Sequence, residues 1–386
     1  MDENTLLMTL LRQQVCGYTP EPMEAPTPEQ LEKLYVLAQR QDLAHIAGQA
    51  LGSMKLLGED ETSKKLKDMS MQAIYRYVQL SYELAQSCKV LEEARIPFIP
   101  LKGSVLRQYY PEPWMRTSCD IDILVQEKDL DQAVTVLKEK LQYQGEGKSD
   151  HDVLLRSSGG TTLELHFDTI QERYANNTSR DVLSEIWQEA SPIQAGSSHM
   201  LLSDPMFYFY HIAHMAKHFE VGGCGVRSFL DIWILNHKVS HEKENRDQLL
   251  QAGGLLRFAR AAEKLSEVWF SGVPMDDWSK QLNDYILRAG LYGDFENRAA
   301  LGQAKEGGKF RYVLTRRIFM PYNYLKAEYP ILEKHKWLTP IYQVVRWFRA
   351  LRRGEWNKRV RELQINAGVS REATTSAGNL LRHLGL

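Results

Sequence analysis

Apolar residues recur every three or four positions through much of the chain, and this spacing is typical of amphipathic helices. Residues 73–94, with the sequence AIYRYVQLSYELAQSCKVLEEA, show the pattern clearly. Their core-facing stripe is predicted to comprise Ile74, Tyr77, Val78, Leu84, Ala85, Cys88 and Leu91. Thr27 followed by Pro28 predicts the start of an earlier helix, because threonine is a fair N-cap and proline suits the first helical position. We therefore expect residues 1–94 to be helical.

The pattern changes to short apolar runs and strict alternation after residue 95. The segments IPFIPLKG (96–103) and DIDILV (120–125) are predicted to be strands. Residues 127–142, which follow the second of these strands, are predicted to form a helix. Residues 152–168 are predicted to form two more strands joined by a turn at Gly159-Gly160. After Trp187 the spacing becomes helical again. The sequence thus predicts an α+β fold in which a small mixed β-sheet is flanked by N-terminal and C-terminal helical regions.

Four regions are expected from these changes of pattern. They are an N-terminal helical region (1–94), an α/β core (95–190), a helical domain (191–300) and a basic helical C-terminal segment (301–386). Gly307-Gly308 is a candidate break, and the last 15 or so residues are expected to be loosely packed.

Composition narrows the class of protein. The chain has 386 residues, 43% of them hydrophobic and 25% charged, with a net charge of −1, so the molecule as a whole is not built to attract nucleic acid. Four scattered cysteines without a CxxC pair fit a reducing compartment. We see no signal peptide and no run of about 18 apolar residues that would predict a transmembrane helix. A cytoplasmic location is expected.

Charge is distributed unevenly along the chain. Residues 310–362 hold 13 Lys or Arg and 4 Asp or Glu, a local charge of +9, so the remainder carries −10. Within this segment the run IYQVVRWFRALRRG has an apolar stripe of Ile341, Val344, Val345, Phe348 and Leu351, interrupted by Arg346, Arg349, Arg352 and Arg353. Such a helix can lie on anionic lipid or RNA. Packing of the stripe on the protein, with the arginines in solvent, is the more common arrangement.

Asp120 and Asp122 stand one residue apart within an apolar strand. Residues i and i+2 of a strand share a face, so the two carboxylates project together and repel unless a cation lies between them. Hard divalent cations prefer oxygen ligands and leave room for substrate phosphates. An exposed edge with two solvated acids is the alternative for this pair considered alone.

Glu164 strengthens the metal hypothesis. It shares one face of its strand with Thr162, His166 and Asp168, while leucines and Phe167 take the other face. Three carboxylates on one sheet face can hold two metal ions, an arrangement suited to in-line displacement at phosphorus. The alternatives are a simple polar face for Glu164 and a structural role for His166.

Gly103 and Ser104 lie where a strand ends and a short helix is predicted to begin. Glycine allows close approach of the backbone to a ligand, and the free N–H groups at a helix start suit a phosphate. Lys102 could add a positive charge there. The GxxxxGK[ST] spacing of a Walker A loop is absent.

These residues together resemble the nucleotidyltransferase superfamily that includes DNA polymerase β and the antibiotic nucleotidyltransferases. More narrowly, residues 96–125 with LELHFD (163–168) resemble an uncharacterised bacterial nucleotidyltransferase family whose core reads LKG…YP…R…DID-L-V and then ELHW. The resemblance covers about residues 70–235. Phe167 replaces a tryptophan that is frequent in the family. A later family region corresponds to AKHFEVGGCGVRSFLDIWIL, which places His218, Arg227 and Asp231.

The resemblance implies an activity and a division of roles. It implies a metal-dependent transfer of an NMP from an NTP to a hydroxyl acceptor, with release of pyrophosphate. Asp120, Asp122 and Glu164 would hold Mg²⁺ or Mn²⁺, and Glu164 would also help to deprotonate the acceptor. Lys102, Gly103, Ser104 and Arg116 would contact the nucleotide phosphates, although a surface role for Arg116 is equally open. ATP is one candidate donor.

Several histidines and one Arg–Asp pair outside the acidic cluster can be interpreted either as cleft residues or as structural residues. His211, His214 and His218 fall on one helix face, where they could line a cleft; a zinc site is disfavoured because no HExxH frame is present. His166, His218, Arg227 and Asp231 are candidate cleft residues. Arg227 and Asp231, four apart, are expected to pair with each other on one helix face, unless Arg227 reaches a phosphate.

The acceptor and even the reaction class have alternatives. The acceptor could be a small molecule, tRNA or a protein side chain, and an RNA would be expected to contact the basic residues 310–362. A glycosyltransferase that uses DxD to bind a nucleotide-sugar is an alternative, but it does not need the Gly-Ser helix start. A catalytically silent nucleotide-binding protein is the third reading.

Overall fold

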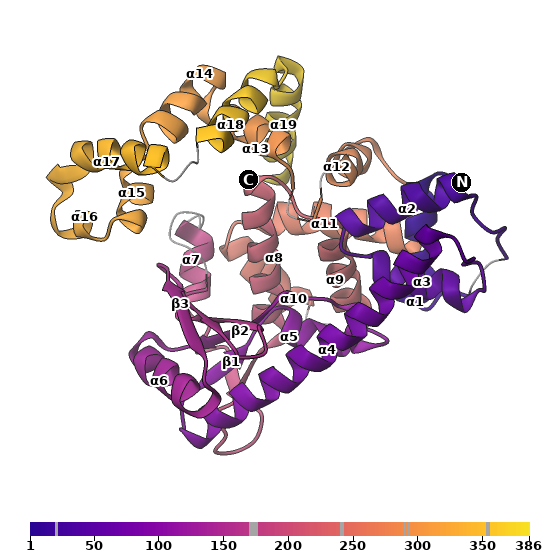
Figure 1. The fold of residues 1–386 in the computed structure, drawn as a ribbon, viewed down its shortest axis with the longest axis horizontal. Helices are drawn as coiled ribbons and strands as arrows, with labels where there is room; N and C mark the ends of the chain where they lie inside the picture. Colours follow the sequence, from indigo (N-terminus) through magenta and orange to yellow (C-terminus); the bar gives the residue numbers. More distant parts are fainter. Residues whose placement is uncertain (20–21, 170–176, 240–242, 289, 292, 353–355) are drawn as a thin grey trace.

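The computed structural model describes residues 1–19, 22–169, 177–239, 243–288, 290–291, 293–352 and 356–386 (Figure 1). It confirms the α+β class: helices flank one five-stranded mixed sheet on the N-terminal and C-terminal sides. A second, two-stranded sheet pairs β6 (Ala190–Pro192) with β7 (Met200–Leu202).

The chain begins with four helices, as the apolar spacing predicted. They are α1 (Glu3–Gln14), α2 (Pro28–Arg40), α3 (Ala44–Ser53) and α4 (Glu61–Glu93). Thr27 caps α2, and Gln30 completes a capping box by binding back to the Thr27 backbone. The stripe predicted for α4 is only partly correct, since Leu91 is buried whereas Val78 is 58% exposed.

The five strands run in the order β1-β2-β5-β4-β3. Their bounds are β1 (Phe98–Pro100), β2 (Asp120–Val125), β3 (Gln144–Lys148), β4 (Asp152–Arg156) and β5 (Thr162–His166). Only the β2–β5 pair is parallel; β4 and β5 form the predicted hairpin. Glu164 therefore lies opposite Asp122 because β5 pairs directly with β2.

Strand alternation gives the sheet one apolar and one polar face. Ile121, Ile123, Leu163 and Leu165 are buried on the apolar face, where they pack with residues of α4 and α6 (Leu130–Leu141). The acidic residues of β2 and β5 consequently lie on the opposite face.

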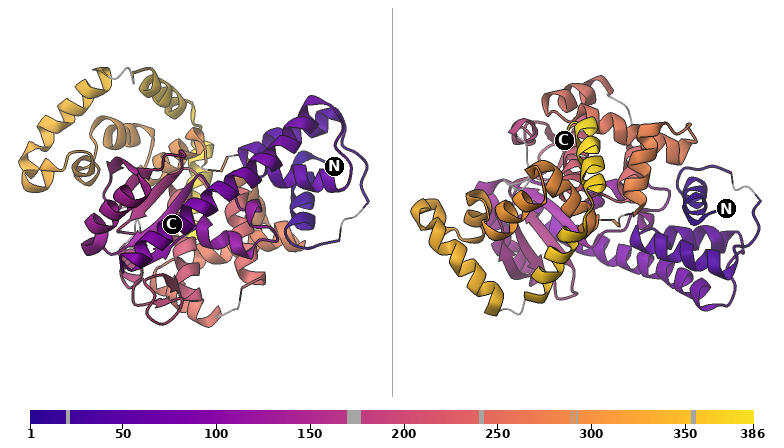
Figure 2. Two further views of the ribbon diagram at one scale, coloured as in Figure 1. Left: turned by 60° about the horizontal axis from the view of Figure 1, so that its bottom comes forward. Right: turned by 90° about the horizontal axis from the view of Figure 1, so that it is seen from above.

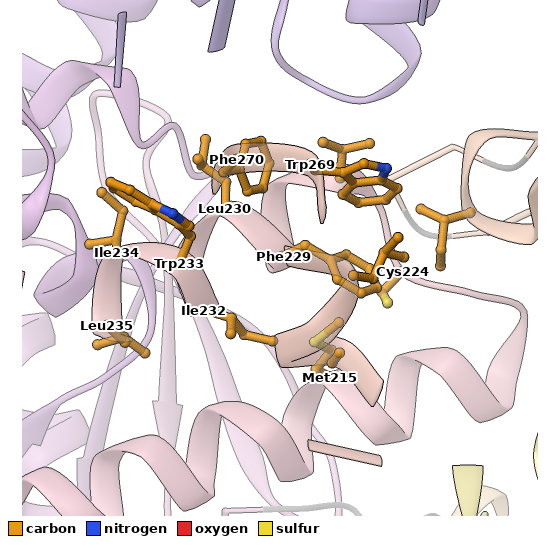
Figure 3. Close-up of a cluster of buried hydrophobic side chains, with 14 of the residues drawn as sticks. Met215, Cys224, Phe229, Leu230, Ile232, Trp233, Ile234, Leu235, Trp269 and Phe270 are labelled. Atoms are coloured by element: carbon orange, nitrogen blue, oxygen red, sulfur yellow. The ribbon is translucent and has the colours of Figure 1, made fainter. Parts of the chain in front are cut away.

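The helices after the sheet share a core with the N-terminal helices. This core joins α1–α3 to α8 (Asp204–Val221), α9 (Val226–His237), α10 (Lys243–Ala252) and α11 (Leu256–Ser271). Figure 3 shows part of this core, where Phe229 and Trp233 of α9 lie near Trp269 and Phe270 of α11. Helix α9 is apolar around most of its circumference because neighbouring helices cover it.

Further helices complete the described part of the chain. They are α7 (Asn177–Ser184), α12 (Asp277–Arg288), α13 (Phe295–Glu306), α14 (Lys309–Tyr312), α15 (Tyr322–Glu328), α16 (Ile331–Lys334), α17 (Thr339–Arg352), α18 (Trp356–Gly368) and α19 (Arg371–Leu384). Figures 1 and 2 show α15–α17 as an arm that projects from the body. The predicted break is present, since α13 ends at Gly307 in the left-handed conformation. The predicted loose C-terminus is wrong: α19 buries Leu380, Leu381 and Leu384.

Helix α17 does not follow the common arrangement of a basic amphipathic helix. Ile341 is 53% and Phe348 63% exposed, whereas Arg346 is buried and donates to the Ile318 carbonyl at 2.9 Å. Arg349 lies 3.5 Å from a Glu328 oxygen. The side chains of Leu351 and Arg352, and all of Arg353, fall outside the described residues. Among the helices that are described, none has both the length and the apolar character needed to cross a bilayer.

The crossing of α3 over α4 offers a test of this packing. A Cβ atom added at Gly48 would lie 2.4 Å from the backbone oxygen of Leu66 in α4, so Gly48→Ala must push the helices apart. We expect a loss of about 1–3 kcal/mol in the free energy of unfolding, measured by denaturant titration. Gly52→Ala is the matched control on the same helix, because its Cβ would meet only Leu57 Cδ1, at 3.9 Å. Equal stabilities of the two variants would contradict this packing.

Candidate active site

A cavity of about 360 Å³ opens between the polar face of the sheet and helices α8 and α9. Most of the residues singled out from the sequence line it. They are Lys102, Gly103, Arg116, Asp120, Asp122, Glu164, His166, His218, Arg227 and Asp231. Ser104 is not among the lining residues, and its backbone N–H donates to the Leu101 carbonyl at 3.1 Å.

Asp122 lies at the centre of the charged cluster and is 3% exposed. Its Oδ1 atom accepts from Lys102 Nζ at 2.7 Å and from His166 Nε2 at 2.9 Å. Burial alone would raise the pKa of Asp122, but the Lys102 charge and the His166 hydrogen bond outweigh it and hold the pKa below its ordinary value. Asp122 is therefore ionised at neutral pH.

Glu164 lies directly across the parallel pair from Asp122. Its Oε2 atom is 3.4 Å from His166 Nε2 and 3.9 Å from Lys102 Nζ. The His166 hydrogen bond lowers the pKa of Glu164, against the effect of burial. Lys102 thus supplies the counter-charge, and His166 a hydrogen bond, that allow the two carboxylates to lie together.

Asp120 is less well compensated than its neighbours. Burial, together with the charges of Asp122 and Glu164, raises its pKa to about 6. The ligand atoms of Asp122, Glu164 and His166 lie within 4.8 Å of one another, a spacing at which one cation could contact all three, but Asp120 is outside that set. The high pKa of Asp120 marks a negative charge that lacks a partner, which is what a bound divalent cation would supply.

Lys102 has an unusual backbone for a non-glycine residue, with φ +47° and ψ −124°. Strained conformations of this kind persist where the surroundings demand them, often at functional sites. Here the strain turns the chain from β1 into α5 (Gly103–Leu106) and directs the ammonium group to Asp122. A Cβ on Gly103 would lie 3.1 Å from Ser118 Cβ, so any larger residue would have to displace Ser118 slightly.

Arg116 is committed to an internal ion pair. Its guanidinium binds both oxygens of Asp231, with Nε at 2.7 Å and Nη2 at 2.9 Å, and Tyr110 donates to the same carboxylate at 2.7 Å. The expected Arg227–Asp231 pair is therefore not formed. Arg227 instead pairs with Asp42 and contacts the Thr117 carbonyl at 3.2 Å.

Helix α8 contributes three histidines and a tyrosine to the opposite wall. The Nε2 atoms of His214 and His218 are 3.3 Å apart, and burial lowers the pKa of His218 to about 4. The Tyr210 hydroxyl is buried without a hydrogen-bond partner in the described part of the chain. His211 also lines the cavity, as the one-face spacing predicted. Burial lowers the pKa of all three histidines, which are therefore neutral at physiological pH.

Sequence reasoning missed several polar residues of the cavity, among them His151, Asp152 and Lys217. His151 and Asp152 come from the segment SDHD at residues 149–152, where a histidine stands between two acids just before a strand. That concentration of potential ligand side chains could have been used to predict a place in the site. For Lys217, which lies among the α8 histidines, the sequence offered no indication other than its position on the helix.

The fold and site define a class of protein: a small mixed sheet that carries acids on one face of a polar cavity. A family model described as an uncharacterised nucleotidyltransferase matches residues 27–271, and the chain belongs to that family. This membership supports nucleotidyl transfer as the general activity, with an NTP as substrate. No curated protein and no solved structure matches the chain.

The buried Arg116–Asp231 pair leads to a stability prediction. Asp231→Asn would leave the Arg116 charge buried without its partner, and we expect a loss of about 3–5 kcal/mol in the free energy of unfolding. Burial alone would raise the pKa of Asp231, but Arg116 lowers it below the ordinary 3.8. The stabilisation is therefore full above that unfolded-state value and is lost as the pH falls from there through the lower pKa of the folded protein. The difference in the free energy of unfolding between variant and wild type should become smaller below about pH 4.

Denaturant titrations at several pH values measure this gap. Glu29→Gln is the control, because it breaks a fully exposed ion pair with Lys33 and should leave stability close to wild type. A gap for Asp231→Asn that stays constant down to pH 2 would contradict the assigned ion pair.

Proposed function

We propose that the protein is a metal-dependent nucleotidyltransferase that transfers an NMP from an NTP to a hydroxyl acceptor and releases pyrophosphate. The observation that carries the proposal is the pairing of Asp122 with Glu164 across β2 and β5, beside Asp120, on the wall of a cavity. The family match adds support, because it spans all three acids.

The donor set fits hard divalent cations. Asp120, Asp122 and Glu164 would hold Mg²⁺ or Mn²⁺ through carboxylate oxygens. When bound, such cations would neutralise charge that develops on the α-phosphate and on the departing pyrophosphate. Glu164, with its lowered pKa, is ionised and would accept the proton of the acceptor hydroxyl.

Lys102 would exchange one anionic partner for another. Its ammonium group now binds Asp122, and a triphosphate in the cavity would offer it stronger charges. Gly103 would allow the phosphates to approach the backbone, and a contact from Ser104 stays a prediction from the sequence. Arg116 would support the site through Asp231 and not by direct phosphate contact, since each of its three guanidinium nitrogens already donates to Asp231 or to the Thr117 carbonyl.

The acceptor would enter along helix α8. His211, His218 and Tyr210 give that wall neutral hydrogen-bonding groups, which suit a polar hydroxyl compound. For an RNA acceptor the basic segment 310–362 would add phosphate contacts, although Arg316, Arg346 and Arg349 already contact Glu306, Ile318 and Glu328. A small-molecule acceptor is therefore the one we favour.

Isotope transfer tests the reaction directly. Purified protein is incubated with Mg²⁺ or Mn²⁺, each α-³²P-NTP and fractionated cell extract, and label is followed into small molecules, RNA and protein. We expect transfer from the α-labelled but not from the γ-labelled nucleotide. Asp122→Asn should reduce transfer by roughly 100-fold or more, because a charge-stabilising group is lost.

Asp131→Asn, on the exposed side of α6, is the matched control and should retain activity. Transfer from γ-labelled nucleotide would indicate a kinase instead. Transfer of sugar from a labelled nucleotide-sugar would select a glycosyltransferase. Absence of transfer that depends on Asp122, with every nucleotide and both metals, would refute the proposal.

Lys102→Met separates the two roles of the lysine. Removing the ammonium group frees Asp122, so Mn²⁺ should bind more tightly in the absence of nucleotide. Binding of a non-hydrolysable NTP should weaken by about 10- to 100-fold, the loss expected for one charged hydrogen bond. Electron paramagnetic resonance measures free Mn²⁺, and calorimetry measures the nucleotide. Unchanged affinity for both ligands would show that Lys102 has neither role.

A further inference from the structure

A second group of potential metal ligands lies on the same sheet face, beside the carboxylates of the proposed active site. A nitrogen of His151, a nitrogen of His166 and a carboxylate oxygen of Asp152 all lie within 4.8 Å of one another. Asp152 and His166 face each other across the antiparallel β4–β5 pair, so strand register fixes their proximity. We infer that His151, Asp152 and His166 form a site for a transition-metal cation of the Zn²⁺ class.

Hydrogen bonds fix which nitrogen of His151 is available. Ser149 Oγ carries a single proton and lies 2.8 Å from Asp152 Oδ1, which can only accept. His151 Nδ1 must then be the donor to Ser149 Oγ, at 2.7 Å, and Asp150 Oδ1 lies 3.2 Å from the same nitrogen. In the neutral imidazole, Nε2 therefore carries a lone pair.

That lone pair faces another acceptor. His151 Nε2 is 3.1 Å from Asp152 Oδ2, and two acceptor atoms at this distance repel each other unless a proton or a metal cation lies with them. The opposite side of each group is already held, since Ser149 binds both His151 Nδ1 and Asp152 Oδ1. Such outer hydrogen bonds orient metal-binding histidines and carboxylates in proteins.

His166 supplies the third ligand atom. Its Nε2 is occupied by Asp122 at 2.9 Å and Glu164 at 3.4 Å. Its Nδ1 is buried and has no hydrogen-bond partner among the described residues, and the whole side chain is only 4% exposed. A buried polar atom without a partner is costly, and a metal bound at Nδ1 would remove that cost.

The ligand types distinguish this site from the one at Asp120 and Asp122. Two imidazoles and one carboxylate suit Zn²⁺ and similar transition metals, whereas oxygen-only sets suit Mg²⁺. All three residues line the 360 Å³ cavity, so a fourth position would remain open to water or a substrate atom. The inference concerns binding alone and does not depend on the proposed nucleotidyl transfer.

Cobalt(II) provides the test, because its visible spectrum reports tetrahedral coordination. The chelator-treated full-length protein is titrated with Co²⁺ in the presence of excess Mg²⁺, and Zn²⁺ is then added as competitor. We expect one equivalent of Co²⁺ with strong tetrahedral absorption, displaced by Zn²⁺ and not by Mg²⁺. A spectrum equal to that of aqueous Co²⁺, or displacement by Mg²⁺, would overturn the inference without any variant.

Variants locate the bound ion. His151→Gln and Asp152→Asn should each weaken Zn²⁺ binding by about 100-fold or more, as expected for the loss of a ligand and its oriented shell. Asp120→Asn and His237→Gln should bind as wild type, since neither belongs to the set. Binding lost in His214→Gln but kept in His151→Gln would place the ion at the α8 histidines and refute this site. Circular dichroism verifies folding, and Asp152→Asn decides the location if His151→Gln is unfolded.

Discussion

The parallel pairing of β2 with β5 is the constraint on which the site depends. Its register sets Asp122 opposite Glu164 and Leu124 opposite His166. Because side chains alternate along a strand, burial of Ile121, Ile123, Leu163 and Leu165 forces the acids to the other face. A slip of one residue would put carboxylates into the apolar layer against α4 and α6, so hydrophobic burial fixes the geometry of the charges.

That geometry concentrates negative charge, and the chain compensates it with one ammonium group and one imidazole N–H group. Lys102 and His166 both bind Asp122, and both reach Glu164. The balance requires a strained backbone at Lys102, and it leaves Asp120 with a raised pKa. Of the three carboxylates, Asp120 is therefore the one whose charge is least compensated.

Local pattern was sufficient to predict the sheet face and its acids. Alternation placed Asp120, Asp122, Glu164 and His166 together, and turn residues gave the hairpin. Spacing alone failed where partners come from distant segments: Arg227 and Asp231, four apart on α9, pair with Asp42 and Arg116 instead. Those choices depend on how α9 packs against the loops before β2, which no local pattern contains.

The basic segment shows the same limit of local reasoning. Its helical period was recognisable, but which face of α17 is covered depends on contacts with the π-helix at Val313–Ile318 and with α15. Helix α19 was predicted to be loosely packed because Thr374, Thr375 and Gly378 make its sequence polar and weakly helical. The short apolar cluster at its end is nevertheless sufficient to bury the helix against the protein. The division into four regions stays a prediction, although the N-terminal helices and α8–α11 share one core.

His166 connects the two halves of the polar face. Asp122 is ionised and can only accept, so His166 Nε2 must carry the proton between them, and Nδ1 is left without a hydrogen-bond partner among the described residues. If a hard cation bound to Asp122, the Glu164 carboxylate would still lie 3.4 Å from His166 Nε2 and could hold the imidazole ring in the same orientation. Carboxylate oxygens on the β2 side and imidazole nitrogens on the β4 side would thus allow one cavity wall to bind two cations of different chemistry at the same time.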